Sequence, residues 1–372
     1  MRLVIDGRRL TAERTGVGRF LELLLSEWAL TGWPMTEVVL VSRDRAGRAR
    51  VPDAPGLETI VVGERWPGLV WETFGLGRVL RPGDLLFAPA NLVPWTWRGA
   101  TVAVVHDTLP WSVPESFPWH VRVRFGGRYR MAARRATRIV APSRCTARDV
   151  ARVHRVPLDR IEVVNPAPDP RLTPLAADAL EVCEARSRLG LGDAPFYLFV
   201  GKRSRRRNVP AILSAFARLR ERHPEHRLVF VGPNGGEPVP ADAPGVVLAG
   251  HVAEEVLHGL LTSAEALVYP SDYEGFGLPV VEAQACGCPV ITLRNSALEE
   301  SGGDAALYLD SASSHEIERA LEAIATRPEL RARLAALGLA NADRFRADRF
   351  AQGVKEVIQA VAAANASESL DT

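Results

Sequence analysis

The sequence is poor in cysteine and has no long apolar run. Its four cysteines among 372 residues are too few and too scattered for a disulfide framework. They are Cys145, Cys183, Cys286 and Cys288. One residue separates Cys286 from Cys288, without a second cysteine pair or a nearby histidine, so two small buried thiols are expected there rather than a zinc site. No apolar run approaches the roughly 18 residues that span a bilayer.

The N-terminal segment also lacks the features of a signal peptide. The apolar residues Leu3, Val4 and Ile5 are followed at once by Asp6 and Gly7, which is too early for the apolar core of a secretory leader. The segment instead predicts the first strand of a folded domain. Together with the low cysteine content, it indicates a protein of the reducing cytoplasm.

Lysine is nearly absent, so arginine supplies almost all of the positive charge. The formal net charge of +2 hides a difference between the two halves of the chain. Residues 1–172 contain 26 arginines and 17 acidic residues, whereas the remainder contains 20 basic and 27 acidic residues. The first half therefore carries a balance of +9 and the second a balance of −7, which predicts an anionic partner for the first half.

Length and hydrophobicity predict two folded domains. At roughly 150 residues per domain, 372 residues suggest two, and a hydrophobic content of 47% supports real cores and excludes disorder of the whole chain. Strand-length apolar runs alternate with helical patterns, which predicts an α/β fold with parallel sheets covered by helices. We expect domains over 1–168 and 169–346, a helix over 347–363 and a disordered tail over 364–372.

The most informative stretch joins two apolar runs of buried-strand length, 266–269 and 289–293. Between them lie the loop Glu274-Gly275-Phe276-Gly277 and a helix that starts at Leu278-Pro279. Glycines and a helix start offer backbone N–H groups to an anion, as phosphate sites require. Glu274 and Glu282 are better suited to sugar or ribose hydroxyls, because a carboxylate repels phosphate. This stretch predicts a nucleotide-sugar pocket; the alternative is a tight turn with two solvated glutamates.

The same residues carry a family resemblance. The sequence EGFGLPVVEA, followed by GCPVI, resembles the donor-site signature of the retaining glycosyltransferases of family 4. The resemblance implies the GT-B fold, with two Rossmann-like domains facing each other across a cleft and a C-terminal helix that returns to the first domain. The donor-binding residues that it implies are Gly16, Gly201, Val252, Gly275, Phe276, Gly277, Leu278 and Glu282. Backbone groups near Val252 would meet the nucleotide base.

A cation pair is expected after the strand that ends at Gly201. Family 4 chains show G-R-x-x-x-x-K there, with both cations on the donor diphosphate. This sequence swaps the order, because Lys202 stands in the arginine position and Arg207 in the lysine position. Both positions remain cationic, so they can still neutralise the diphosphate. The planar fork of arginine and the point charge of lysine give different hydrogen-bond geometries, however. Arg203, Arg205 and Arg206 are interpreted as a solvated loop.

His106 follows the predicted strand 101–105. Ligands of parallel sheets bind at the carboxyl ends of the strands, although a structural histidine would also fit that position. The segment T-L-P-x-x-x-P-E after it resembles the H-D loop of family 4, whose histidine contacts the donor sugar. Gly16 belongs to a G-x-G turn between a strand and a helix, which the family places opposite the donor phosphate.

The segment 95–138 combines aromatic residues with arginines. Seven arginines lie between residues 120 and 138, and five tryptophans and phenylalanines precede them. This pattern fits a membrane interface or an anionic, lipid-linked acceptor, and it equally fits a solvated amphipathic helix above buried aromatics. No nucleic-acid recognition motif accompanies the charge.

The predicted activity is transfer of a hexose from a nucleotide-diphosphate sugar to a glycan or lipid-linked acceptor, with retention of configuration. His106, Lys202, Arg207 and Glu274 are the expected catalytic residues. No D-x-D motif stands at a strand end, so neither a metal nor another cofactor is expected. A nucleotide-sugar 2-epimerase and a non-catalytic nucleotide-sugar-binding protein are the alternatives.

The resemblance also suggests a cellular setting. The opening IDGRRL and TGVGRF are similar to bacterial mannosyl- and rhamnosyltransferases of surface polysaccharide assembly. We expect a cytoplasmic protein, with peripheral contact to the inner face of the membrane as an option. Base, sugar, acceptor, linkage and oligomeric state are not readable from the sequence.

Overall fold

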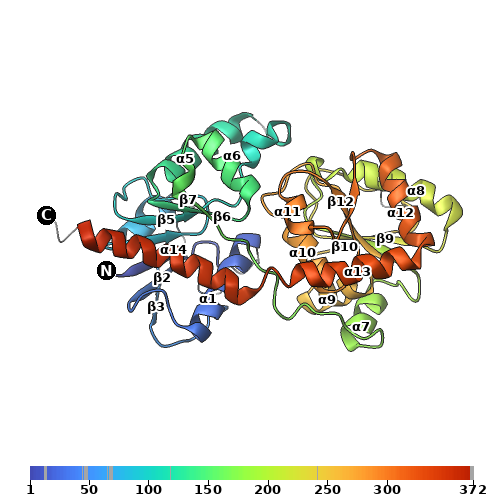
Figure 1. Ribbon diagram of the computed structural model, residues 1–372, viewed down its shortest axis with the longest axis horizontal. Coiled ribbons are helices and arrows are strands. Elements are labelled where there is room, and N and C mark those ends of the chain that lie inside the picture. The colour runs from blue at the N-terminus through green and yellow to red at the C-terminus, as the bar shows by residue number, and fades with distance from the viewer. Residues whose placement is uncertain are drawn as a thin grey trace. The chain divides into compact units, whose positions relative to one another are not determined.

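The computed structural model describes residues 1–11, 15–43, 45, 49–64, 66, 70–117, 119–240 and 242–368. The chain forms two compact units (Figure 1). The first combines Met1–Pro166 with Ala347–Thr372, and the second is Ala167–Arg346. None of the helices in these described ranges is long and apolar enough to cross a membrane.

The first unit is built on a seven-stranded sheet in the order β3-β2-β1-β4-β5-β6-β7. The strands are β1 (Leu3–Asp6), β2 (Val38–Ser42), β3 (Leu57–Val61), β4 (Leu85–Ala88), β5 (Thr101–Val104), β6 (Arg138–Ala141) and β7 (Ile161–Val163). All of its strand pairings are parallel. Every residue of β1, β4 and β5 is buried, as expected for central parallel strands with helices on both faces.

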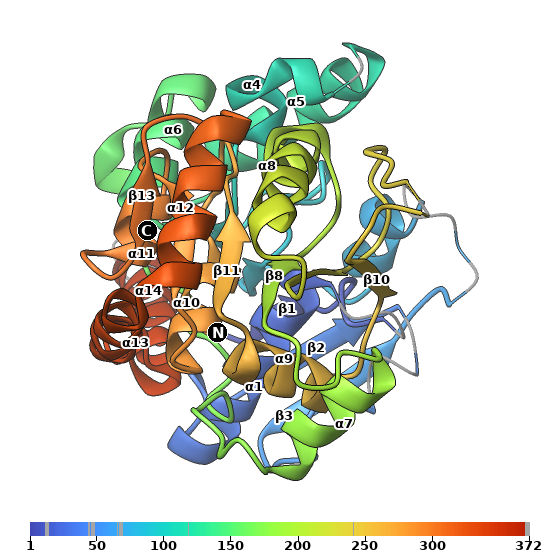
Figure 2. The same ribbon diagram turned by 90° about the vertical axis from the view of Figure 1, so that its right-hand side faces the viewer.

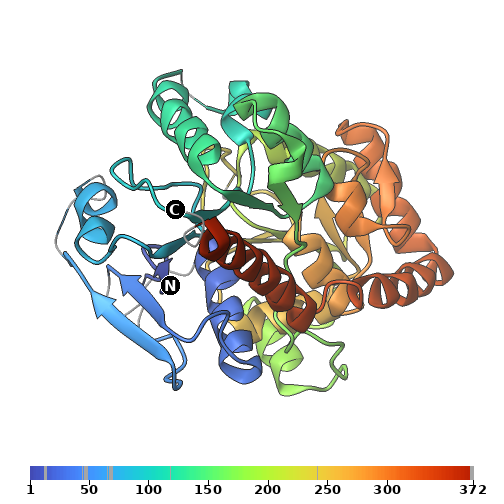
Figure 3. The same cartoon turned by 60° about the vertical axis from the view of Figure 1, so that its left-hand side comes forward.

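Helices and short turns connect these strands. They are α1 (Gly16–Thr31), η1 (Trp71–Gly75), η2 (Leu76–Arg78), α4 (Leu109–Ser112), η3 (Pro114–Ser116), α5 (Trp119–Arg135), α6 (Arg144–His154), η4 (Leu158–Arg160) and α14 (Ala347–Glu368). The last of these, α14, packs on α1 (Figure 3). The indole Nε1 of Trp28 donates to the carbonyl of Ala351 at 3.0 Å, and the Phe20 and Phe350 rings meet edge to face.

The C-terminal helix is longer than the sequence predicted. The sequence predicted a helix over 347–363 and a disordered tail over 364–372, but α14 continues to Glu368. The added residues include two alanines and no glycine or proline, so nothing in them stops a helix. Residues 369–372 lie outside the described residues.

The second unit has a six-stranded parallel sheet in the order β10-β9-β8-β11-β12-β13. The strands are β8 (Phe196–Val200), β9 (Arg227–Val231), β10 (Val246–Gly250), β11 (Ala266–Tyr269), β12 (Val290–Leu293) and β13 (Leu307–Leu309). The helices are α7 (Leu180–Arg188), η5 (Arg205–Arg207), α8 (Val209–Arg222), α9 (Glu254–Ser263), α10 (Leu278–Ala285), α11 (Leu298–Gly302), α12 (Ser314–Thr326) and α13 (Pro328–Ala342).

Each face of this sheet has its own apolar core. Tyr197 and Phe199 of β8 point to the face covered by α8 and α12, while Phe196 and Leu198 point to the face covered by α7, α9 and α10. This alternation is the period of two that a strand imposes on its side chains. Cys286 and Cys288 are buried in the second core, as the sequence predicted.

The strand order reverses once in each sheet. Successive strands of the second sheet run outward from β8 to β10 and then in the opposite direction from β11 to β13, so the order reverses between β8 and β11 (Figure 2). In the first sheet the reversal lies between β1 and β4. In open α/β sheets, ligands bind beyond the carboxyl ends of the strands at such a reversal.

Candidate active site

Glu274 is the centre of a polar cluster beyond the carboxyl end of β11. Its Oε1 accepts hydrogen bonds from the Tyr269 hydroxyl at 2.7 Å and the Ser271 hydroxyl at 3.0 Å. The same oxygen accepts from Arg207 Nε at 3.3 Å and from Arg206 Nη1. Within the described residues, every hydrogen bond of this carboxylate falls on Oε1. Oε2 is thus left to meet a ligand.

The charge state of this cluster follows from its burial. Burial by itself raises the pKa of Glu274, but the Arg207 and Arg206 guanidiniums outweigh it and lower that pKa to about 2. Burial raises the pKa of Tyr269 above its usual range. At neutral pH the carboxylate is therefore charged and the tyrosine is a protonated donor. Two positive charges and one negative charge leave a net positive site.

The arginine run after β8 is only partly exposed to solvent. Arg203 and Arg206 were interpreted as solvated, but Arg203 is buried. Arg206 Nη1 donates to the Ser271 hydroxyl at 2.9 Å and to the Tyr273 carbonyl at 2.7 Å, in addition to Glu274. The run folds back across the strand ends, where buried acceptors are available. Arg205 alone of the three is exposed, as predicted.

Lys202 and Arg207 meet at the end of β8. Arg207 Nη1 donates to the Lys202 carbonyl at 3.2 Å, and its guanidinium lies 5.1 Å from the centre of the Tyr269 ring. The Lys202 side chain is exposed. Gly201 has φ +126°, and a side chain there would overlap the Arg207 guanidinium. The glycine therefore allows the arginine to cross the strand end.

The predicted anion loop leads into α10. Gly277 caps this helix with φ 96° and ψ 44°, a conformation that favours glycine, and an added Cβ would lie 2.9 Å from Leu298 and from Ser301. Glu282 is buried one turn after Leu278, on the same side of the helix. The loop thus brings a helix start and a second carboxylate close to each other.

Phe276 and Val252, two of the residues predicted to bind the donor sugar nucleotide, have different surroundings from the residues above. Phe276, which follows Gly275, packs its ring edge to face with Phe345 in a small apolar cluster, so only its backbone can face a ligand. Val252 follows β10, two strands away from β8, and its carbonyl lies 3.2 Å from His251 Nδ1. It shares the carboxyl edge of the sheet with Lys202 without touching the Glu274 cluster.

His106 and Gly16 lie in the first unit. The Nε2–H of His106 donates to the Pro89 carbonyl at 2.7 Å, because a carbonyl can only accept. Its backbone N–H donates to Asn91 Oδ1 at 2.9 Å, and its ring meets Phe20 edge to face. Burial lowers the pKa of His106, despite the opposing effect of the Pro89 hydrogen bond. The imidazole is therefore neutral and keeps an acceptor lone pair on Nδ1.

The two glycines of the first helix start have different surroundings. Thr15 caps α1 by accepting from the Gly18 N–H at 3.1 Å. A Cβ at Gly18 would lie 2.8 Å from the Arg9 carbonyl, whereas a Cβ at Gly16 would meet no described atom within 4 Å. The close approach of Arg9 thus explains why position 18 is a glycine. No described residue makes such a contact at Gly16, so a ligand could approach it.

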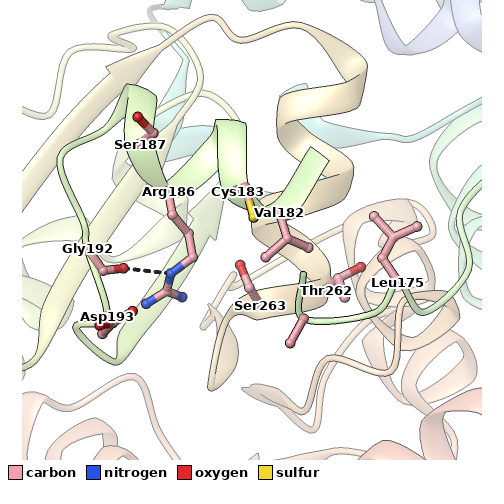
Figure 4. Close-up of a pocket in the computed structure, with 10 residues that line it drawn as sticks. Leu175, Val182, Cys183, Arg186, Ser187, Gly192, Asp193, Thr262 and Ser263 are labelled. Atoms are coloured by element: carbon pink, nitrogen blue, oxygen red, sulfur yellow. Dashed lines mark hydrogen bonds between the residues drawn. The ribbon is translucent and has the colours of Figure 1, made fainter. Parts of the chain in front are cut away.

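The sequence missed Arg206, Tyr269 and Ser271 as members of the site. Tyr269 ends a buried strand and Ser271 follows a proline, so both were visible as strand-end polar groups. Nothing in the arginine run indicates which of its members turns inward. A separate hollow of about 740 Å³ lies between α7 and the end of α9 (Figure 4). None of the site residues named above lines it in the described part of the chain.

Two parallel sheets, each with one reversal of strand order, define a doubly wound α/β class of protein. Family models identify the class further. The model for "Glycosyltransferase Family 4" matches residues 14–172, and that for "Glycosyl transferases group 1" matches residues 184–338. The chain belongs to the family 4 glycosyltransferases, with the two Rossmann-like domains of the GT-B fold.

Relatives and solved structures agree with this assignment. The chain is 30% identical to O-antigen chain mannosyltransferase B of Escherichia coli, over 56% of this chain and 57% of the relative. It is 32% identical to D-inositol 3-phosphate glycosyltransferase of Xylanimonas cellulosilytica, over 59% of this chain and 56% of the relative. The match thus spans little more than half the length of each relative.

Among solved structures, the chain is similar to Anabaena HepE in complex with UDP and glucose, with a TM-score of 0.74, 17% identity and coverage of 96% of this chain and 99% of that one. WaaG, a glycosyltransferase involved in lipopolysaccharide biosynthesis, gives the same values. At this identity the likeness supports the fold alone.

Proposed function

We propose that this protein transfers a hexose from a nucleotide-diphosphate sugar to a glycan or lipid-linked acceptor, without a metal and with retention of configuration. The observation that carries the proposal is the cluster of Lys202, Arg207 and Glu274 beyond β8 and β11, where the strand order reverses. The relatives named as mannosyltransferases favour mannose as the sugar.

The two cations have the role of holding the diphosphate. Arg207 is fixed by Glu274 and by the Lys202 carbonyl, so its guanidinium is preorganised, whereas the exposed Lys202 ammonium can follow the phosphates. Fixed positive charge that faces the leaving group stabilises the charge that develops there. Two cations and the start of α10 supply this charge, so the transfer does not require a metal.

The carboxylates and the histidine have the role of holding hydroxyl groups. Glu274 Oε2 accepts from the sugar and Glu282 from the ribose, while the neutral His106 accepts a sugar hydroxyl at Nδ1. In the transfer, the bond between the anomeric carbon and the phosphate oxygen breaks and the acceptor oxygen bonds to the same face. The acceptor's proton passes to the leaving phosphate, which becomes the free nucleoside diphosphate.

The acceptor would approach through the basic, aromatic surface of the first unit. Trp95 and Trp119 expose 57% and 74% of their surface, and Val123 is also exposed. Trp111 instead packs against Tyr129. Exposed aromatics beside an arginine-rich helix favour an anionic, lipid-linked acceptor at the cytoplasmic face of a membrane. Co-sedimentation with phosphatidylglycerol vesicles should weaken in Trp119→Ser, but not in Leu180→Ser, which removes an exposed apolar residue from the second unit.

Thermal shift against GDP-, UDP- and dTDP-sugars identifies the donor, and transfer is then measured with and without a chelator. We expect Glu274→Gln and Lys202→Ala to lower turnover by about 100-fold or more. Arg205→Ala, which removes an exposed neighbouring cation, should have little effect. Near-normal turnover in either site variant would reject the assigned roles. An epimerised sugar formed without acceptor would favour a 2-epimerase, and binding without turnover a binding protein.

A further inference from the structure

A second cluster of polar side chains lies at the amino ends of the strands of the second sheet, opposite the carboxyl ends that carry the Glu274 cluster. His223, Glu225 and His226 form the turn between α8 and β9, and one potential ligand atom from each lies within 4.8 Å of the other two. Within the described ranges this is the one group of three histidine, cysteine or acidic side chains that meets this criterion.

Each histidine is oriented by a carboxylate on its far nitrogen. His223 Nε2 lies 3.1 Å from Glu322 Oε1, and His226 Nε2 lies 3.0 Å from Glu265 Oε2. A carboxylate only accepts, so each Nε2 carries a hydrogen. In a neutral imidazole, the lone pair then sits on Nδ1.

Both Nδ1 atoms face the same carboxylate oxygen. Glu225 Oε1 lies 3.7 Å from His223 Nδ1 and 3.1 Å from His226 Nδ1. Three acceptors converge there, and a cation between them would relieve their mutual repulsion. Ligands bound to zinc at 2.0–2.1 Å in a tetrahedron lie about 3.4 Å apart, which falls between the two observed separations.

The outer carboxylates are themselves held in place. Arg222 Nη2 donates to Glu322 Oε2 at 2.9 Å, and Arg331 pairs with Glu265. The pattern of metal ligand, histidine and carboxylate partner is typical of protein zinc sites, because the carboxylate fixes the ring and raises its basicity. A polar turn that only contacts solvent would not need these two carboxylate–arginine pairs behind its histidines.

The cluster is closed on one side and open on the other. The His226 side chain is 6% exposed and stacks on the Tyr197 ring, His223 is 22% exposed, and Glu225 is 53% exposed. Two oriented imidazoles and a carboxylate, with solvent at the remaining position, match a His₂Glu set completed by water.

We propose that His223 Nδ1, His226 Nδ1 and the Glu225 carboxylate bind one divalent metal ion of the zinc class. The ion would lie at the start of β9. This five-residue strand is about 17 Å long, so the site is remote from the strand ends that carry Lys202. It would tie the α8–β9 turn to α12 through Glu322 and to the loop before β11 through Glu265, and so stabilise the second unit without taking part in transfer.

The test uses the full chain, stripped with a chelator and titrated with Co²⁺ and then Zn²⁺. We expect one ion per chain, a tetrahedral cobalt spectrum and a higher melting temperature with zinc. His223→Gln and Glu225→Gln should weaken binding at least tenfold and abolish the thermal shift. His315→Gln removes an exposed histidine of α12 and should behave like the unmodified chain.

A further variant tests the outer layer. Glu322→Gln should weaken the metal 10- to 100-fold while it keeps the tetrahedral cobalt spectrum, because the three ligands remain. The proposal is overturned if the folded, unmodified chain binds no ion, or if His223→Gln and Glu225→Gln bind as tightly as His315→Gln.

Discussion

The Tyr269 hydroxyl donates to Oε1 of Glu274 at 2.7 Å. This bond joins the last residue of a buried strand to the loop that precedes α10. Because Tyr269 is fully packed and burial raises the pKa of its hydroxyl, the donor is present at neutral pH. The carboxylate is thus held by a residue of the sheet as well as by the two arginines that donate to the same oxygen.

Acid should lower the free energy of unfolding because it protonates Glu274. Its pKa is about 2 in the folded chain against an ordinary 4.5, so its stabilising effect is complete above pH 4.5 and is lost as the pH falls towards 2. The shift corresponds to about 3 kcal/mol. In denaturant titrations, the stability difference between the unmodified chain and Glu274→Gln should shrink from pH 5.5 to pH 3. A difference that stays constant would contradict this.

Arg206 should contribute far more to the stability of the fold than Arg205 does. Arg206→Met leaves Glu274 and the Tyr273 carbonyl without a nearly buried donor, which should cost about 2 kcal/mol or more of unfolding free energy. Arg205→Met removes an exposed cation from the same turn and should change stability by less than about 0.5 kcal/mol. Equal effects in chemical denaturation would place Arg206 in solvent.

Gly201 should tolerate a methyl group less well than another glycine of similar conformation. Gly201 has φ +126° and Gly236 has φ +104°, so alanine at either position costs about 1 kcal/mol in backbone strain. Only at Gly201 does the new Cβ overlap Arg207. Gly201→Ala should therefore lose further stability and weaken nucleoside diphosphate binding at least tenfold. Calorimetry on both variants would show whether Gly236→Ala binds normally, as we expect.

His154 should make the first unit sensitive to mild acid. It is fully buried, neither ring nitrogen has a hydrogen-bond partner within the described residues, and its ring meets Trp111 edge to face. Burial, followed by the charges of Arg130 and Arg134, lowers its pKa to about 4.

The unfolded chain takes up this proton near pH 6.5, so stability is complete above pH 6.5 and falls by up to about 3 kcal/mol towards pH 4. His154→Leu should remove this dependence. Melting curves that keep the same slope against pH in this variant would assign the acid sensitivity to another group.

The sequence predicted the fold class and family because the strand-length runs and the EGFG motif are local features. The side-chain partners of Glu274 were not predictable in the same way. Arg203, Arg205, Arg206 and Arg207 are alike in composition, and only the path of the chain across the strand ends decides which of them turns inward. The H-x-E-H turn was visible too, but its orienting carboxylates lie 39 and 99 residues further along the chain.

The return of α14 to the first unit also sets an order for biosynthesis. The second unit is one continuous segment, so it can fold as soon as residue 346 has left the ribosome. Trp28 is synthesised more than 300 residues before Ala351, whose carbonyl accepts its hydrogen bond. One side of the first unit therefore stays uncovered through most of translation, and truncation within α14 would damage the earliest-made part of the protein.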